Sequence, residues 1–172
     1  KRQGIILGFT GPIESLTPDM AAGAELAIDE INKSKHFSMG KVSGVRADST
    51  CVDSAAATTA AERLITSDKV NGIMGADCSG VTTAILQQVA MANGMVMVSP
   101  SATSPALSTV EDNGLFFRTA PSDARQGQVV ADILKEKGLT NIAISYVNND
   151  YGKGLAASIE ENHKAAGGTV TI

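Results

Sequence analysis

Cys78 and Ser79 stand together in the sequence GADCSGVTTAILQQ, after a glycine-bounded apolar run and before a stretch with a helical pattern. A cysteine or serine at such a strand-to-helix turn could act as a nucleophile, but ADCSG lacks the G-x-S-x-G pattern. The chain has two histidines that could serve as a base. We expect His36 in the loop after the first helix and His163 among apolar residues on one face of a later helix. Neither follows the carboxyl end of a strand, so we expect no catalytic residue and a protein that is not an enzyme.

Cys51 and Cys78 follow the second and third predicted strands. If those strands are neighbours in a parallel sheet, their carboxyl ends bring the cysteines close enough for a disulfide. Such a bond would stabilise the fold by about 3–4 kcal/mol through chain entropy and would indicate an oxidising compartment. A pair of free buried thiols is the alternative. No CxxC motif or nearby histidine accompanies the cysteines, so we expect no metal site.

Capture of a small polar ligand is the third possibility for this region. Ser79 is expected at the start of a helix, where backbone amides and the helix dipole attract an anion. A simple N-cap role is the alternative, and serine suits it equally well. The sequence SPSATSP adds Ser101, Thr103 and Ser104 at the end of the adjacent strand, in a loop stiffened by two prolines. These hydroxyls and amides could form a pocket for a carboxylate, although Thr103 could also be a plain turn residue.

Strands and helices must alternate to bring these residues together. Apolar runs predict strands at 4–11, 41–49, 70–77, 94–101, 114–120, 141–148 and 169–172. Helical periodicity predicts helices at 19–33, 120–138 and 151–168 and two more after the second and third strands. The apolar stripe of the first helix is Met20, Ala24, Ala27, Ile28 and Ile31. The stripe after the second strand is Ala57, Ala61, Leu64 and Ile65, and the stripe after the third strand is Val81, Ile85, Val89 and Ala92. This alternation indicates an α/β fold in which doubly wound parallel sheets are covered by helices on both faces. Ligands of such sheets bind beyond the carboxyl ends of the strands.

A break in the pattern divides the chain. Only a loop separates SPSATSP from GLFFRT, and a proline stands just before the next helix. We interpret residues 119–122 as a crossing, with a first ligand-binding lobe at 1–119 and the beginning of an incomplete second lobe at 120–172. Two strands and two helices are too few to form a stable α/β layer alone. We therefore expect part of a longer protein, or a protein that is only partly ordered.

Composition excludes several kinds of partner. The net charge is −4 and the chain has no cluster of lysine and arginine, so we expect neither nucleic acid nor an anionic membrane surface as a partner. No apolar run approaches the roughly 20 residues that cross a bilayer. The first residues do not form a signal peptide, so an exported protein would be in its processed form. GFTG and YGKG do not match nucleotide-binding motifs, and we expect no cofactor.

Motifs along the whole chain then show a resemblance. They are TGPIES, GAELAIDEIN, DSTCVDSAAATTAAERLI, GADCSGVTTAI, VSPSATSPALS, LFFRTAPSDARQGQVVA and DYGKGLAASI. Together they resemble the leucine/isoleucine/valine-binding family of type I periplasmic solute-binding proteins, which serve ABC importers. The resemblance implies a longer protein with two doubly wound lobes and a ligand held between them.

The resemblance also implies roles for single residues. Ser79 matches the serine that holds the ligand carboxylate, and Ser101 matches the position whose backbone carbonyl receives the ligand ammonium. Thr103 matches the threonine that helps to hold both groups. Tyr151 matches the aromatic residue of the second lobe that closes over the ligand.

Further positions follow from the same resemblance. Cys51 and Cys78 match a disulfide found in many amino-acid-binding members. Leu16 and Thr17 stand where such members often carry an aromatic residue, which leaves the side-chain preference open. Asp123 is a candidate to face the ligand near the crossing, and a plain N-terminal helix residue is the alternative.

These inferences predict a periplasmic solute-binding protein of an ABC importer. It would capture a branched-chain type of amino acid or a similar small carboxylate and present it to a membrane permease. A ligand-sensing domain of a receptor or regulator with the same fold is the alternative. The exact ligand stays open, because the acidic residue that would pair with its ammonium lies outside this sequence.

Overall fold

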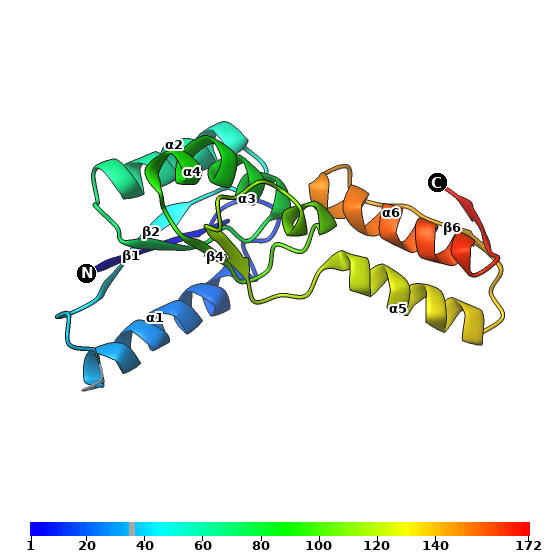
Figure 1. The fold of residues 1–172 in the computed structure, drawn as a ribbon, viewed down its shortest axis with the longest axis horizontal. Helices are drawn as coiled ribbons and strands as arrows, with labels where there is room; N and C mark the ends of the chain where they lie inside the picture. Colours follow the sequence, from blue (N-terminus) through cyan, green and yellow to red (C-terminus); the bar gives the residue numbers. More distant parts are fainter. Residues whose placement is uncertain (35–36) are drawn as a thin grey trace. The chain divides into compact units, whose positions relative to one another are not determined.

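Strands and helices alternate along the computed structural model, which describes residues 1–34 and 37–172 (Figure 1). The predicted loop position of His36 lies outside the described residues. The strands are β1 (Arg2–Leu7), β2 (Ser43–Asp48), β3 (Gly72–Gly75), β4 (Met97–Ser99), β5 (Phe116–Arg118), β6 (Asn141–Ala143) and β7 (Thr169–Thr171). The helices are α1 (Thr17–Lys33), α2 (Ser54–Thr66), α3 (Ser79–Ile85), α4 (Met91–Asn93), α5 (Asp123–Glu136) and α6 (Asp150–Ala165), with a π-helix η1 (Leu86–Ala90) and a 3-10 helix η2 (Pro105–Ser108).

A parallel five-stranded sheet, counted over the described ranges, has the order β2-β1-β3-β4-β5. The chain thus winds outward from β1 in both directions, which confirms the predicted doubly wound α/β fold. The direction reverses between β1 and β3. In open sheets of this kind the crevice beyond the carboxyl ends of the strands at such a reversal is the usual place for a ligand.

The two faces of this sheet are covered unequally. On one face Ile73, Met97 and Phe116 are paired in register and all are buried. On the other face Ile5 packs against α1, whereas Val98 and Phe117, paired in register toward the sheet edge, are 36% and 55% exposed. Helix α1 therefore covers the β1 side of this face and leaves its β4–β5 side open.

The buried stripe of α1 agrees with the predicted one at Met20, Ala24 and Ile28, which pack against the core cluster. Thr17 and Ala21 are fully buried, and Ile28 packs against the same cluster. Ala27 and Ile31 lie exposed, contrary to prediction. The predicted stripe was therefore too wide, because Ala27 and Ile31 lie at the border of the packed face.

The helical segment after β3 also departs from simple periodicity. Val81, Ile85 and Val89 are buried as predicted, but Ala92 is exposed. The π-helix η1 contains Val89 and ends before Ala92, and its wider turn shifts the residues that follow it from the α-helical phase. In α2 the predicted stripe is buried except at Ile65, which is half-buried: Ala57, Ala61, Leu64.

The chain divides into two compact units. The first unit is Lys1–Ala102 with Glu111–Thr119, and the second is Thr103–Val110 with Ala120–Ile172. No helix among residues 1–34 and 37–172 is long and apolar enough to cross a membrane.

The second unit contains a parallel pair of strands, β6 and β7, and two helices, α5 and α6, that pack against each other. The helices approach closely at Gly127, where a Cβ atom would lie 2.6 Å from the backbone carbonyl carbon of Ser158. The Ser158 hydroxyl donates to the Ala124 carbonyl at 3.2 Å across the same contact. The predicted strand 141–148 is shorter in the structure, since its partner β7 offers only three residues for pairing.

Candidate functional site

Asp77 organises the carboxyl edge of the first sheet. It lies just beyond the end of β3, after Ala76, and is 3% exposed. Its carboxylate accepts hydrogen bonds from the Gly8 amide at 2.7 Å and the Cys78 amide at 3.0 Å. The Ser49 hydroxyl, beyond the end of β2, donates to the same carboxylate at 3.3 Å. One buried side chain therefore joins the segments that follow three strands. Asp77 was not among the predicted site residues, although an acidic residue at the end of an apolar run is a signal that could have pointed to it.

Asp48 ends β2 and forms a second, more exposed junction. Its carboxylate accepts from the Thr10 hydroxyl at 2.6 Å, the Thr10 amide at 3.3 Å and the Thr50 amide at 2.8 Å. Partial burial raises the pKa of Asp48, but these bonds together outweigh that effect and hold its pKa below the ordinary value. Asp48 thus ties the loop after β1 to the loop after β2.

Cys51 and Cys78 form the predicted disulfide, with their Cα atoms 5.2 Å apart. The reasoning from neighbouring strands was wrong, however, because β1 lies between β2 and β3. The bond reaches over the end of β1, where Gly8 leaves room: a Cβ atom there would lie 3.2 Å from Cys51 Cβ. Cys51 itself has a φ of 68°, a left-handed conformation that turns its loop toward β3.

Ser79 is the first residue of α3 and is 2% exposed. The N-cap of this helix is Cys78, so the alternative of Ser79 as the N-cap is wrong. The Ser79 carbonyl accepts from the Thr83 hydroxyl at 3.0 Å. Three consecutive residues therefore have three different roles. Asp77 carries the buried carboxylate, Cys78 forms the disulfide, and Ser79 begins α3.

Ser101, after β4, is joined to the same edge. Its hydroxyl donates to the Asp77 backbone carbonyl at 3.0 Å, and its amide donates to the Ser99 hydroxyl at 3.4 Å. Ser99 in turn is fully buried and donates to the Ala76 carbonyl. The structure therefore brings the segments that carry Ser79 and Ser101 together around Asp77, within the first unit.

Thr103 and Asp123 form a pair in the second unit. The Thr103 hydroxyl donates to the Asp123 carboxylate at 2.7 Å, and the Asp123 amide donates to the Thr103 carbonyl at 2.9 Å. Asp123 begins α5 and is 1% exposed, so it is both a first-turn helix residue and a buried partner. A hydroxyl has one proton to donate, so Thr103 could donate to a ligand carboxylate only by releasing Asp123.

Leu16 and Tyr151 are the remaining predicted site residues. Leu16, just before α1 in the first unit, is 61% exposed. Tyr151 lies in the first turn of α6 in the second unit and is 42% exposed. It lines a mostly apolar cavity of about 230 Å³ with residues of its own unit: Ile144, Ser145, Tyr146, Val147, Gly152, Leu155, Ala156 and Ile159.

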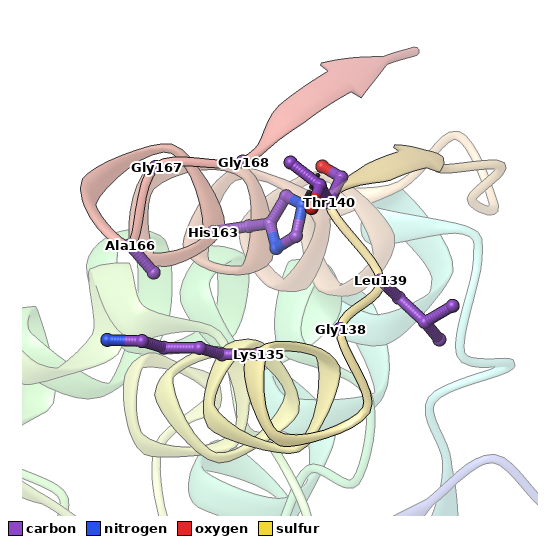
Figure 2. Close-up of a pocket in the computed structure, with 8 residues that line it drawn as sticks. All are labelled: Lys135, Gly138, Leu139, Thr140, His163, Ala166, Gly167 and Gly168. Atoms are coloured by element: carbon purple, nitrogen blue, oxygen red, sulfur yellow. Dashed lines mark hydrogen bonds between the residues drawn. The ribbon is translucent and has the colours of Figure 1, made fainter.

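His163 is buried, as expected of a helix residue with apolar neighbours. Its Nε2 lies 2.8 Å from the Thr140 carbonyl, so Nε2 carries the hydrogen, since a carbonyl only accepts. Figure 2 shows the ring at the edge of a cavity of about 110 Å³, above the side chain of Lys135. Nδ1 has no hydrogen-bond partner among the described residues. No group of three or more histidine, cysteine, aspartate or glutamate residues in the described part of the chain could hold a metal ion.

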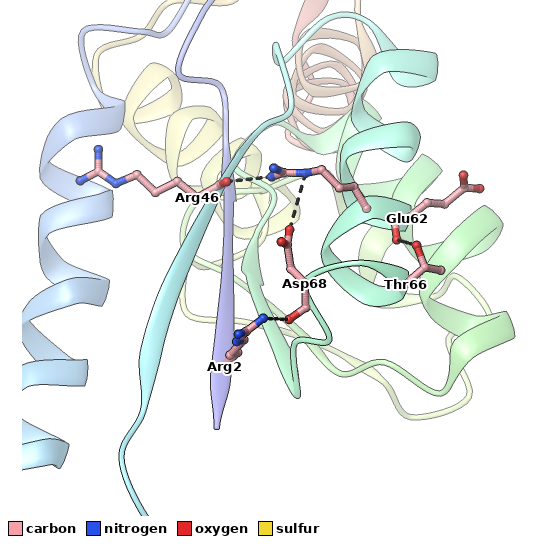
Figure 3. A network of polar contacts seen from close by, with 6 residues as sticks. Arg2, Arg46, Glu62, Thr66 and Asp68 are labelled. Atoms are coloured by element: carbon pink, nitrogen blue, oxygen red, sulfur yellow. Dashed lines mark hydrogen bonds and ion pairs between the residues drawn. The ribbon is translucent and has the colours of Figure 1, made fainter.

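An arginine-rich network in the first unit joins backbone segments (Figure 3). Arg2 donates to the Asp68 carbonyl at 2.8 Å, and Arg63 donates to the Arg46 carbonyl at 2.9 Å while pairing with the Asp68 carboxylate. Arg46 makes a bidentate pair with Glu25, which lowers the pKa of that carboxyl. These guanidinium groups are therefore engaged in holding β1, β2 and the end of α2 together.

Comparison with known proteins gives one family for nearly the whole chain. Residues 19–172 match the receptor family ligand binding region. A leucine-, isoleucine-, valine-, threonine- and alanine-binding protein of Pseudomonas aeruginosa is 30% identical over 164 residues, which are 95% of this chain and 43% of that protein. A Leu/Ile/Val-binding protein of Citrobacter freundii is 30% identical over 98% of this chain and 45% of its own length. The chain therefore spans less than half the length of these relatives.

Solved structures agree with this grouping. A leucine binding protein of Thermotoga maritima superimposes with a TM-score of 0.86 at 27% identity, over 99% of this chain and 47% of that one. A branched-chain amino acid binding protein of Streptococcus pneumoniae in complex with isoleucine gives 0.83 at 28% identity, over 95% and 46%. A Rhodopseudomonas palustris solute-binding protein in complex with benzoate gives 0.87 at 22% identity over 99% and 46%, which is a likeness of fold alone.

Proposed function

Because the chain belongs to the receptor family ligand binding region, and with it to the leucine/isoleucine/valine-binding family of type I periplasmic solute-binding proteins, we propose that it captures a small carboxylate for an ABC importer. The ligand proposed is an amino acid of the branched-chain type or a similar small carboxylate. The observation that carries the proposal is the likeness of 95% of the chain to a protein named for binding leucine, isoleucine, valine, threonine and alanine. The relatives are binding proteins, and this favours binding over catalysis.

The proposed chemistry uses groups at the carboxyl edge of the first sheet. Ser79 would bind the ligand carboxylate through its hydroxyl and the amides at the start of α3, and the Ser101 carbonyl would receive the ammonium. Both residues follow strands near the reversal of winding, where ligands of such sheets bind. Thr103 and Tyr151 would act from the second unit, and Leu16 and Asp123 would border the ligand. In this proposal 1–119 is the first lobe, and 120–172 is part of the second.

The cell compartment and partner follow from the same proposal. The Cys51–Cys78 disulfide is the kind of bond that persists outside the reducing cytoplasm, which supports a periplasmic location. A binding protein there would present its ligand to a membrane permease. A ligand-sensing domain of a receptor is the second candidate, because the matching family is described as a receptor ligand-binding region.

A thermal-shift screen of the full-length protein tests the proposal. The probes are the L-amino acids and benzoate, followed by calorimetry on any that raise the melting temperature. Ser79→Ala should weaken binding by about tenfold or more, since a hydrogen bond to a charged group contributes about 1.5–3 kcal/mol. The matched control is Ser67→Ala at the exposed C-cap of α2, which should leave affinity unchanged. Unchanged affinity in Ser79→Ala, with the fold intact, would remove Ser79 from the site.

An uptake assay with a co-expressed permease distinguishes the importer protein from the receptor domain. Importer function predicts ligand uptake that depends on a co-expressed permease. A receptor domain would bind the same probe and support no uptake.

A further inference from the structure

We propose that Asp77 is the positioning residue of this binding site, a role that rests on the proposed function. It is a residue that holds the ligand-binding groups in place and does not itself touch the ligand. Asp77 is a buried residue, with 3% of its surface exposed. A charged group is placed in such surroundings at a large cost unless hydrogen bonds compensate it. Here two of the three donors to the carboxylate, the Gly8 amide and the Ser49 hydroxyl, come from other loops.

Four strand ends meet at this one residue. The Gly8 amide follows β1, the Ser49 hydroxyl follows β2, and the Cys78 amide begins the segment after β3. The fourth is β4, because the Ser101 hydroxyl donates to the Asp77 backbone carbonyl. The two strands at the reversal of winding, β1 and β3, are thus joined by the shortest of these contacts, the 2.7 Å bond from the Gly8 amide. The 3.0 Å bond from the Cys78 amide fixes the turn within the segment that follows β3.

Both oxygens of the carboxylate are needed. Oδ2 accepts from the Gly8 amide, and Oδ1 accepts from the Cys78 amide and the Ser49 hydroxyl. An asparagine at this position offers one oxygen and one NH₂ group. In either orientation of its amide, one backbone N–H would face another donor, so Asp77→Asn removes a bond without changing the size of the side chain.

The same bonds set the positions of the proposed ligand groups. Ser79 follows Cys78 directly, so the bond from the Cys78 amide determines where the Ser79 hydroxyl and amide lie. The Ser101 hydroxyl is held by Asp77, and this bond orients the Ser101 backbone, whose carbonyl is proposed to receive the ammonium. Binding groups must stay within about 0.5 Å of their productive positions, so release of these two segments should lower affinity.

The disulfide does not make Asp77 redundant. It joins Cys78 to Cys51 over the end of β1 and involves neither Ser101 nor the Gly8 amide. A side-chain variant at Asp77 can therefore keep the disulfide and still lose the register between the loop after β3 and the loop after β1. Intact-mass measurement after alkylation, without reductant, shows that the bond is present in each variant tested.

The experiment compares Asp77→Asn with Asp48→Asn in the full-length protein. Asp48 is a matched control, because its carboxylate also accepts hydrogen bonds at a strand end, and these come from the loops after β1 and β2 and not from the segments of Ser79 and Ser101. The measurements are calorimetric Kd values for L-leucine and benzoate, and the midpoint of urea unfolding. We expect both variants to unfold at lower urea than the wild type, and only Asp77→Asn to raise Kd, by tenfold or more.

Ser101→Ala is a second variant for the case in which Asp77→Asn does not fold. It removes only the hydroxyl that bonds the Asp77 carbonyl and keeps the Ser101 carbonyl, so it should also raise Kd. A Kd equal to that of the wild type in every folded variant would overturn the positioning role and leave the proposed function standing.

A wild-type protein that binds neither probe would count against the proposed ligand class, not against the geometry. Amide hydrogen exchange then decides the inference. Exchange at Ser79 and Ser101 that is faster in Asp77→Asn than in Asp48→Asn supports it, and equal exchange in the two variants overturns it.

Discussion

Replacing Gly127 with alanine should force α5 and α6 apart. A Cβ atom at this position would lie 2.6 Å from the carbonyl carbon and the Cβ of Ser158, whereas carbon atoms in contact prefer about 3.5–4.0 Å. The carbonyl carbon belongs to the backbone, so no change of rotamer can relieve the overlap. The helices must separate by about 1 Å along a contact that also carries the Ser158–Ala124 hydrogen bond.

The magnitude follows from two opposing effects. Overpacking of a tight contact costs about 1–3 kcal/mol, and a backbone overlap belongs at the upper end of that range. Alanine gains about 0.8–1 kcal/mol over glycine in a helix interior. We therefore expect Gly127→Ala to lower the free energy of unfolding by about 2 kcal/mol.

Gly23→Ala is the control, because Gly23 is also in a helix, α1, and a Cβ atom there would meet nothing within 4 Å. It should gain up to about 1 kcal/mol from helix propensity alone. Urea denaturation of the full-length protein, followed by circular dichroism, measures both variants. Equal or greater stability of Gly127→Ala, beside the expected gain in Gly23→Ala, would refute the close-contact reasoning.

Two further predictions concern the loops at the carboxyl edge. Replacing Cys51 and Cys78 together by serine should lower the free energy of unfolding by about 3–4 kcal/mol, measured by urea denaturation without reductant, and an unchanged midpoint would contradict the stabilising role of the disulfide. The pKa of Asp48 is lower in the folded state than in the unfolded chain, so its contribution to stability is present above about pH 4 and is lost as the pH falls through the folded-state pKa. As the pH is lowered below about 4, the melting temperature should therefore fall less steeply in Asp48→Asn than in the wild type. Parallel curves of melting temperature against pH would show that this carboxylate does not contribute to stability.

Local patterns predicted the order of the elements, because each apolar run and each helical stripe is written in consecutive residues. They could not predict that β1 separates β2 from β3, since the strand order depends on where distant segments pair. The disulfide was therefore predicted correctly, although the assumption that β2 and β3 are adjacent strands was wrong. The phase change at η1, which exposes Ala92, also has no simple signal in the spacing of apolar residues.

The site was predictable only where residue type and position coincide. Ser79 and Ser101 were proposed because they follow predicted strands, and their role in ligand binding stays a prediction. Asp77 was missed because its importance comes from partners that are far apart in sequence, such as Gly8, 69 residues away. The bond between Thr103 and Asp123 spans 20 residues and was likewise invisible to any local pattern.

The interleaving of the two units has a consequence for folding order. Strand β5 belongs to the first unit, yet the segments on both sides of it, Thr103–Val110 and the chain from Ala120, belong to the second. The Thr103–Asp123 pair closes a loop around this strand, and β5 pairs with β4 alone at the edge of the sheet. Closing that loop early removes much of the entropy that a free three-residue edge strand would lose on docking. We therefore expect β5 to dock on β4 late in folding, after the Thr103–Asp123 pair has formed in the second unit.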